Sequence, residues 1–292
     1  MSIGTRVARL LSATVLAFAA GCDESDLDPA AEAELDVDSE GDDASSGGEP
    51  LADDAFPARA PTEPAAVYDC DFTETFDGPT GAPWPEPWVA SSEVAAADLR
   101  SGWGRLRPIA SDYSLARMLA PLDCQDFDAT VTFMLTDKVT QLAGMYGRHN
   151  GGFLQKTTPR GRGYAVTAEN FRTTDGLSLW RELGGTEQDI SPTAPVVFEP
   201  YVPYRMRLRI KQQTAETTLL RGKVWLASDP EPDAWTVEVY DTASGLRKRS
   251  GSIALDAFSS IGAGGEAGDI YFDDLVVTQA LPLPEPDFSF SG

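Results

Sequence analysis

The sequence predicts an all-β protein, a sandwich of two antiparallel sheets. Residues 204–211 alternate apolar and basic side chains without a break, and residues 128–135 alternate almost as regularly. Strict alternation is typical of a strand with one buried face. Clusters of Gly, Pro, Asp and Asn separate many such short segments. A series of short strands between turn residues, over about 210 residues, favours a single β-sandwich.

We expect this sandwich to occupy residues 67–280. Short runs bounded by turn residues predict its strands. These runs lie at 67–76, 105–108, 128–135, 142–148, 164–169, 177–182, 204–211, 223–227, 236–240, 252–255 and 270–278. Residues 281–292 form a proline-rich tail. Because proline cannot donate to a sheet ladder, we expect the tail to lie outside the sheets.

The first 21 residues resemble a bacterial export signal. Arg6 and Arg9 precede an apolar run at 10–20 that is short for a bilayer span but has the length of a signal-peptide core. The run ends in Ala-Ala-Gly before Cys22, which resembles the lipobox of bacterial lipoproteins. This resemblance implies cleavage before Cys22 and stable anchoring through two or three acyl chains. We expect an exported lipoprotein at the outer membrane or cell surface; the alternative is an ordinary secretory signal.

Residues 22–66 form an acidic stretch of low complexity. They include 15 acidic residues, one basic residue and hardly any large apolar side chain. Such a segment cannot bury enough surface to offset the entropy of ordering it, so we expect a disordered tether.

The whole chain carries a net charge of −23, and its local basic stripe is short. We therefore expect no binding to nucleic acid. The stripe consists of Arg205, Arg207, Arg209 and Lys211.

The three cysteines of the chain divide into two groups. If Cys22 is lipidated, Cys70 and Cys124 remain, each next to a predicted strand. An exported location permits a disulfide, and an even number of remaining cysteines favours one. The alternative is two separate buried thiols. With one histidine and three cysteines, the usual zinc sites are excluded.

Three groups of motifs follow one another through the body of the chain. The first is Asp-Phe-Thr-Glu-Thr-Phe-Asp-Gly-Pro at 71–79, and the second is Gly-Met-Tyr-Gly-Arg at 144–148 with Gly-Tyr-Ala-Val at 163–166. The third combines residues 224–225, 231–235 and 270–277. In this order they resemble concanavalin A-like lectin/glucanase (LamG-like) jelly rolls over residues 71–278. The resemblance implies that the first and last strands pair.

The glucanases of this family cleave glycosidic bonds with two carboxylates on one face of the sheet. No predicted strand shows the Glu-x-Asp-x-Glu spacing that would place such a pair on one face. His149 is the only imidazole that could serve a nucleophile, and no Gly-x-Ser-x-Gly elbow is present. We predict no catalytic residues. The alternative is a divergent glycoside hydrolase that uses Glu169 or Glu182.

Polar and aromatic residues on the middle strands are candidates for ligand binding, because jelly-roll lectins stack sugars on aromatic rings and hydrogen-bond their hydroxyls. Alternation predicts that Tyr146 and Arg148 share a face. His149 is expected in an exposed turn, and Trp225 and Trp235 are expected to be structural. The competing interpretation is that the aromatic candidates belong to the core. The predicted ligand-binding residues are Tyr146, Arg148, Tyr164, Glu169, Trp180 and Arg181.

Three aspartates could form a structural calcium site if the first and last strands meet. Asp77, Asp273 and Asp274 would then supply the oxygen ligands that Ca²⁺ prefers. The alternative is a turn cap at Asp77 and a solvated pair at 273–274. No other cofactor is expected.

Together these features lead to one functional hypothesis. We expect a monomeric, surface-anchored lipoprotein whose sandwich binds a carbohydrate or another surface ligand without catalysis. The alternatives are the hydrolase and a structural or adhesion domain.

Overall fold

A computed structural model describes residues 70–110, 114–170, 175–259 and 267–280. The predicted signal, Cys22, the acidic tether and the proline-rich tail lie outside these residues. In the described ranges the regular structure is entirely β, and none of it is a helix that could cross a membrane. The strands form two antiparallel sheets, which confirms the predicted fold class.

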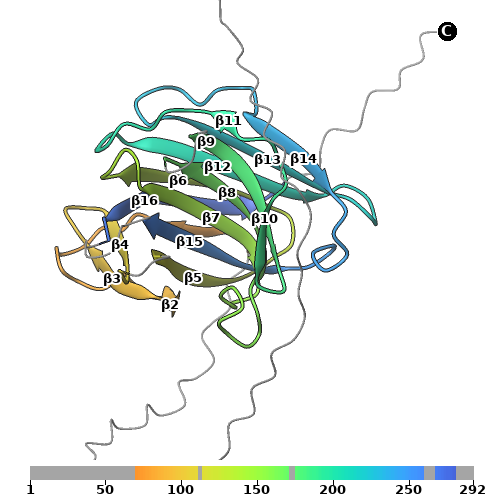
Figure 1. Cartoon of the computed structure of the whole chain (residues 1–292), viewed down its shortest axis with the longest axis horizontal. Helices are drawn as coiled ribbons and strands as arrows, with labels where there is room; N and C mark the ends of the chain where they lie inside the picture. Colours follow the sequence, from red (N-terminus) through yellow and green to blue (C-terminus); the bar gives the residue numbers. More distant parts are fainter. Residues whose placement is uncertain (1–69, 111–113, 171–174, 260–266, 281–292) are drawn as a thin grey trace, which may run out of the picture. The chain divides into compact units, whose positions relative to one another are not determined.

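The first sheet has the strand order β14-β13-β12-β6-β16-β4-β3, with β1 also paired to β16. Figure 1 shows it as one of two stacked layers. Its strands are β14 (Val237–Asp241), β13 (Thr218–Leu226), β12 (Tyr204–Gln212), β6 (Phe127–Leu135), β16 (Ile270–Gln279), β4 (Gly104–Pro108), β3 (Val94–Leu99) and β1 (Phe72–Glu74).

The second sheet has the order β10-β9-β8-β7-β15-β5-β2, with β11 paired to β9. Its strands are β10 (Thr186–Asp189), β9 (Gly176–Leu183), β8 (Arg162–Glu169), β7 (Gln141–His149), β15 (Gly251–Ser259), β5 (Ser114–Cys124), β2 (Val89–Ser92) and β11 (Ala194–Pro195).

The hydrophobic core lies between the inner faces of the two sheets. On β12, Met206, Leu208 and Ile210 are fully buried, while the basic residues between them point outward and are partly exposed. Met118 and Val166 face them from the second sheet and belong to the same core cluster. The alternation in the sequence therefore marks the core side of the first sheet correctly.

Two long-range predictions are confirmed. The first and last strands pair antiparallel, with Phe72 opposite Val277. Cys70 and Cys124 form a disulfide across 54 residues, so the alternative of two separate thiols is wrong.

Five strands were not predicted: β2, β3, β5, β10 and β11. The most important is β5, which at 11 residues is the longest strand in the described chain. The first five residues of β5 are all buried, on both faces of the strand, so this part of the sequence shows no alternation of apolar and polar side chains.

Candidate functional site

The outer face of the second sheet carries a row of polar side chains that crosses five strands. In register, Arg117 of β5 lies opposite Asp256 of β15, which lies opposite Gly144 of β7. Thr167 of β8 and Ser178 of β9 continue the row. Residues two positions along each strand lie on the same face, so this row is flanked by parallel rows of outward side chains.

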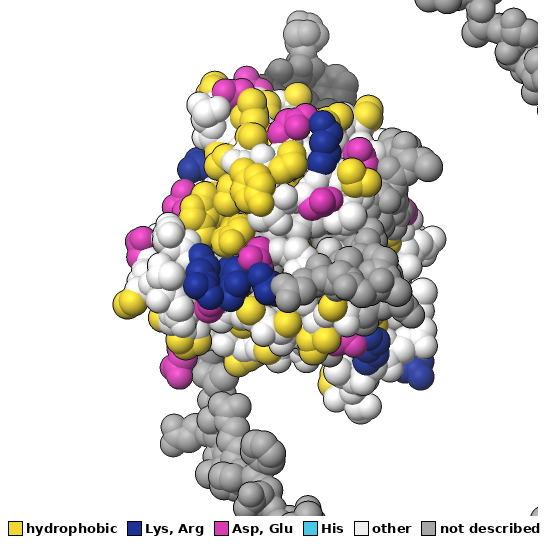
Figure 2. All heavy atoms as spheres, turned by 60° about the vertical axis from the view of Figure 1, so that its left-hand side comes forward, with side chains coloured by type: hydrophobic (Ala, Val, Ile, Leu, Met, Phe, Trp, Pro, Cys, Tyr) yellow, Lys and Arg dark blue, Asp and Glu magenta, His cyan; other side chains and the backbone are white. Residues whose placement is uncertain are grey.

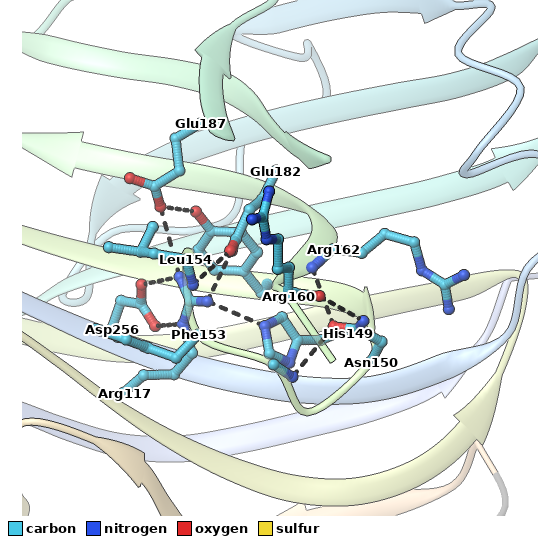
Figure 3. A network of polar contacts seen from close by, with 12 residues as sticks. Arg117, His149, Asn150, Phe153, Leu154, Arg160, Arg162, Glu182, Glu187 and Asp256 are labelled. Atoms are coloured by element: carbon cyan, nitrogen blue, oxygen red, sulfur yellow. Dashed lines mark hydrogen bonds and ion pairs between the residues drawn. The ribbon is translucent and has the colours of Figure 1, made fainter. Parts of the chain in front are cut away.

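Arg117 lies at one end of this row and is completely buried. Its Nε and Nη2 donate to the two carboxylate oxygens of Asp256 at 2.7 Å each, and its Nη1 donates to Glu182 at 2.7 Å. Nη2 also reaches Glu187 at 3.5 Å, and Nη1 lies 3.0 Å from Nε2 of His149 (Figure 3). An arginine has five N–H donors. All five are therefore directed at protein acceptors.

Burial dominates the electrostatics of this Arg117 cluster. It raises the pKa of Asp256 to about 6 despite the opposing charge of Arg117, with Glu187 and Glu182 adding to the rise. Burial also raises the pKa of Glu182 against the same guanidinium. Burial and the nearby positive charges of Arg117 and Arg162 hold the pKa of His149 well below its usual range, so this imidazole is neutral.

The segment between β7 and β8 covers the Arg117 cluster. The Leu154 amide donates to Glu182 at 2.9 Å, and the Phe153 ring lies 5.2 Å from the Arg117 guanidinium. The Tyr146 ring packs against the guanidinium at 4.2 Å, and its hydroxyl donates to Glu187 at 2.5 Å. The cluster is a closed network of partners, which gives it a stabilising role.

The six predicted ligand-binding residues do not come together on one face. Tyr146, Glu169 and Trp180 lie on the outer face of the second sheet. Tyr146 is 2% exposed and engaged by the Arg117 cluster. Glu169 is fully buried and accepts hydrogen bonds from Thr167 at 2.9 Å and Ser178 at 3.1 Å. Only Trp180 is partly exposed, with its indole N–H bonded to Ser178.

The other three predicted residues point to the opposite side. Tyr164 is part of the core, and its hydroxyl donates to Asp241 at 2.6 Å. Arg181 pairs with the same carboxylate at 2.7 Å. Arg148 is fully buried and donates to the carbonyl oxygens of Gln125 and Leu246. All three residues are engaged in contacts within the domain, and their role in ligand binding stays a prediction.

The expectation that Tyr146 and Arg148 share a face is wrong for a specific reason. Arg148 has φ of 54°, and the pairing of β7 with β15 shifts register between Ser252 and Ala254. This irregularity reverses the alternation at the end of β7. It turns Arg148 inward and leaves His149 on the outer side, 1% exposed, rather than in an exposed turn.

The three aspartates proposed for calcium do not form a metal site. Burial and the charges of Asp274, Asp77 and Glu74 raise the pKa of Asp273 to about 6. Asp274 is exposed and pairs with Arg205 at 3.3 Å. Among the described residues no group of three His, Cys, Asp or Glu side chains could hold a metal ion.

The basic stripe on the outer face of the first sheet is largely neutralised. Arg207 forms a bidentate pair with Asp128, at 2.6 and 2.7 Å, and also contacts Glu231. Lys223 pairs with Glu231 at 2.6 Å. Figure 2 shows one face of the domain, on which Lys and Arg, Asp and Glu, and hydrophobic side chains are all present.

A hollow of about 520 Å³ lies on this outer face, next to the neutralised stripe. Trp225 of β13 stands directly opposite Arg205 of β12, and both are partly exposed. The turn after β13 brings exposed carboxylates to the rim. The residues that line the hollow are Thr130, Arg205, Trp225, Asp229, Pro230, Glu231, Asp274 and Val276.

Two polar atoms beneath this Trp225 hollow have no hydrogen-bond partner among the described residues. They are Nε of Arg205 and the hydroxyl of Thr132, which is opposite Arg205 on β6. Within the described ranges, the ion-pair partner of Arg205 is the exposed Asp274, at 3.3 Å. Because the Arg205 side chain is 42% exposed and lines the hollow, its guanidinium can donate to a ligand there.

Burial alone would raise the pKa of Glu231, but hydrogen bonds from Lys223 and Arg207 outweigh it and lower that pKa. Glu231 therefore remains ionised at neutral pH. The hollow thus combines an aromatic surface, a donor and several acceptors.

The sequence predicted a structural role for Trp225. The alternation of β12 predicted that Arg205 points outward, but only the pairing of β12 with β13 shows that Trp225 lies beside Arg205.

No family model matches this chain, and no curated protein matches it. Among solved structures the chain is similar to a Bacillus subtilis protein of unknown function with a galectin-like fold, at 14% identity and a TM-score of 0.47, over 66% of this chain and 90% of the other. It is also similar to lectin II from Ulex europaeus, at 13% identity and 0.46, over 72% and 98%. A third is the carbohydrate-binding module CBM66 from Bacillus subtilis, at 10% identity and 0.43, over 66% and 95%.

Proposed function

We propose that the sandwich is a non-catalytic carbohydrate-binding domain and that the Trp225 hollow is its binding site. One observation carries the proposal: a partly exposed indole lies in a hollow rimmed by Arg205, Asp229 and Asp274. The apolar face of a sugar ring packs on an aromatic surface, while its hydroxyls need both donors and acceptors around the ring. Binding sites of this kind have an aromatic surface and a few oriented polar groups.

The described carboxylates favour binding over glycoside hydrolysis. A glycosidase needs one carboxylic acid that holds its proton at working pH, beside a second ionised carboxylate. Glu231, in the hollow, has a lowered pKa. Glu182 has a raised pKa, but its two oxygens accept from Leu154 and Arg117 under the covering segment.

The test is a glycan array followed by titration calorimetry on the full chain. Trp225→Ala is expected to weaken binding of any glycan hit about tenfold or more, and Trp225→Phe should retain most of it. Tyr240→Ala is the control, because Tyr240 is an exposed aromatic residue outside the hollow. The proposal fails if no glycan binds, or if Trp225→Ala binds as well as the parent chain. Polysaccharide turnover that Glu182→Gln or Glu169→Gln abolishes would favour the hydrolase instead.

We further propose that the domain is held at a membrane surface through lipidated Cys22, with the acidic residues 23–66 as a spacer. The apolar run and the small residues before Cys22 support this proposal. Labelling bacteria with radioactive palmitate should mark the parent chain and leave Cys22→Ser unlabelled and outside the membrane fraction. Label that persists in Cys22→Ser would contradict lipidation at this residue.

A further inference from the structure

We infer that the Trp225 hollow selects uncharged sugars over sugars that carry a carboxylate or a sulfate. This inference rests on the proposed function and concerns the same site. It follows from the charges placed around Trp225: Arg205 is the cation that lines the hollow, whereas Asp229, Glu231 and Asp274 line it as carboxylates.

Neighbouring cations do not offset the excess of carboxylates in the hollow, because they already form ion pairs with other residues. Arg207 binds both oxygens of Asp128 and also contacts Glu231. Lys223 is 5% exposed, pairs with Glu231, and donates to the Pro232 carbonyl oxygen at 2.7 Å. Freeing either cation for a ligand would leave a carboxylate without its partner.

Arg205 alone does not make the hollow an anion site. Its Nη2 is already paired with Asp274, so an acidic ligand must compete with that carboxylate and approach Asp229 as well. Like charges at such short range disfavour binding even near the surface, where water screens them in part. An anion would gain one guanidinium contact and meet two exposed carboxylates.

A neutral sugar can use the same groups without a charge conflict. Its hydroxyl protons can be accepted by Asp229 and Asp274, and its hydroxyl oxygens can accept from the guanidinium of Arg205, whose side chain is 42% exposed. A hydroxyl both donates and accepts, so one ring edge satisfies both kinds of group. The lining therefore complements a polyol better than an anion.

Matched pairs of sugars that differ only in charge test this inference. Saturation-transfer NMR and Trp fluorescence would compare galactose with galacturonate, glucose with glucuronate, and mannose oligomers with mannuronate oligomers on the full chain. In any pair that binds, we expect the neutral member to bind about tenfold tighter at low salt. Added salt should narrow this ratio by strengthening only the acidic member, because salt screens exposed charges.

In the double variant Asp229→Asn/Asp274→Asn, the ratio of neutral-sugar affinity to acidic-sugar affinity should fall close to one, mainly because the acidic sugar binds more tightly. Asp233→Asn is the matched control, because Asp233 is exposed in the same turn but does not line the hollow. An acidic member that binds as tightly as its neutral partner overturns the inference and leaves the proposed function intact. If no sugar of any pair binds, and Trp225→Ala changes nothing, the proposed function and this inference both fail.

Discussion

Arg117 shows how one buried residue determines the character of a whole face. Its guanidinium is surrounded by three carboxylates, and a buried charge is tolerated only when it is paired and hydrogen-bonded. Because all its donors are used, Arg117 organises β5, β15, β9 and β10 and offers nothing to a ligand.

Removing this charge should therefore destabilise the domain strongly. We expect Arg117→Met to lower the free energy of unfolding at pH 7 by about 3–5 kcal/mol, because it leaves Asp256 and Glu182 buried without a cation. Part of the loss should be recovered at pH 5, where the buried carboxylates take up protons. Urea unfolding at both pH values measures this effect.

Arg100→Met is the matched control for that experiment. Arg100 pairs with Asp98 at 2.8 Å, but its side chain is 41% exposed. Surface pairs of this kind contribute about 0–1 kcal/mol. An Arg117→Met variant that is no less stable than Arg100→Met would contradict the role assigned to the Arg117 cluster.

At the scale of elements, Glu182 is one of the residues that fasten the segment between β7 and β8. Leu154 and Arg117 donate to different oxygens of Glu182. In Glu182→Gln one of these oxygens becomes an NH2 group, a donor that faces another donor, so one of the two hydrogen bonds is lost. The segment contains Lys156 and Arg160, and trypsin should cleave the folded variant there faster than it cleaves the parent chain. Glu187→Gln is the control, because Glu187 also contacts Arg117 but does not bind the segment. Equal cleavage of the two variants would show that Glu182 does not fasten the segment.

The disulfide joins residue 70, just before β1, to the end of β5, and so links the two sheets covalently. Closing a loop of 54 residues should stabilise the fold by about 4 kcal/mol in the chain-entropy estimate. We expect Cys70→Ser/Cys124→Ser to unfold at clearly lower urea concentration. Reductant should weaken the parent chain to the same degree and leave the double variant unchanged; if reductant shifts neither protein, the bond does not stabilise the domain.

How much could be predicted from sequence depended on the environment of each strand. β12 has one partly exposed face and one buried face. The alternation of its side chains in the sequence therefore predicted that it is a strand, where it begins and ends, and which side chains point to the core. β5 is buried on both faces over its first five residues, and it contains Pro121, which argues against a central strand. The structure accommodates Pro121 where the pairing of β5 with β15 loses its register.

The candidate sites were harder to predict than the strands because they depend on pairing between distant strands. Arg117 lies on the unpredicted β5, and Asp256 is 139 residues away along the chain. Tyr146 and Arg148 were assigned to one face because a positive φ and a register shift do not show in an alternating sequence. Trp225 became a site residue only through its pairing with Arg205.

At the scale of the whole molecule, acidic charge is concentrated outside the described residues. Between residues 22 and 66 there are 15 acidic residues and one basic residue, within a net charge of −23. The sandwich itself pairs most of its arginines with carboxylates, including Arg105 with Asp98 and Arg107 with Asp269. Its response to pH should therefore depend on its few buried groups more than on total charge.

Three carboxyl groups with raised pKa values predict that the domain is most stable in mildly acidic solution. Asp256 and Asp273 have folded pKa values of about 6, above the usual unfolded value near 4, and the pKa of Glu182 is also raised. A raised carboxyl pKa gives stability that is present at low pH and lost as pH rises through the folded value. His149 acts in the opposite direction, because its pKa is lowered and its unfolded form takes up a proton below about 6.5.

Between pH 6 and about 4.5 the folded chain thus holds more protons through three carboxyl groups than the unfolded chain gains through one imidazole. We expect the urea midpoint to rise as the pH falls from 7 to about 5. Below that range it should fall, since the lowered pKa values of Asp98, Asp137 and Glu231 make their carboxylates stabilising only while ionised. For each proton that the folded chain holds in excess of the unfolded chain, the free energy of unfolding changes by about 1.4 kcal/mol per pH unit. Asp273 is only partly buried, so Asp273→Asn should remove a part of this effect and flatten the rise, whereas Asp71→Asn, at an exposed position, should not. A stability maximum at pH 7 or above in the parent chain would mean that the buried carboxyl groups do not hold their protons as described.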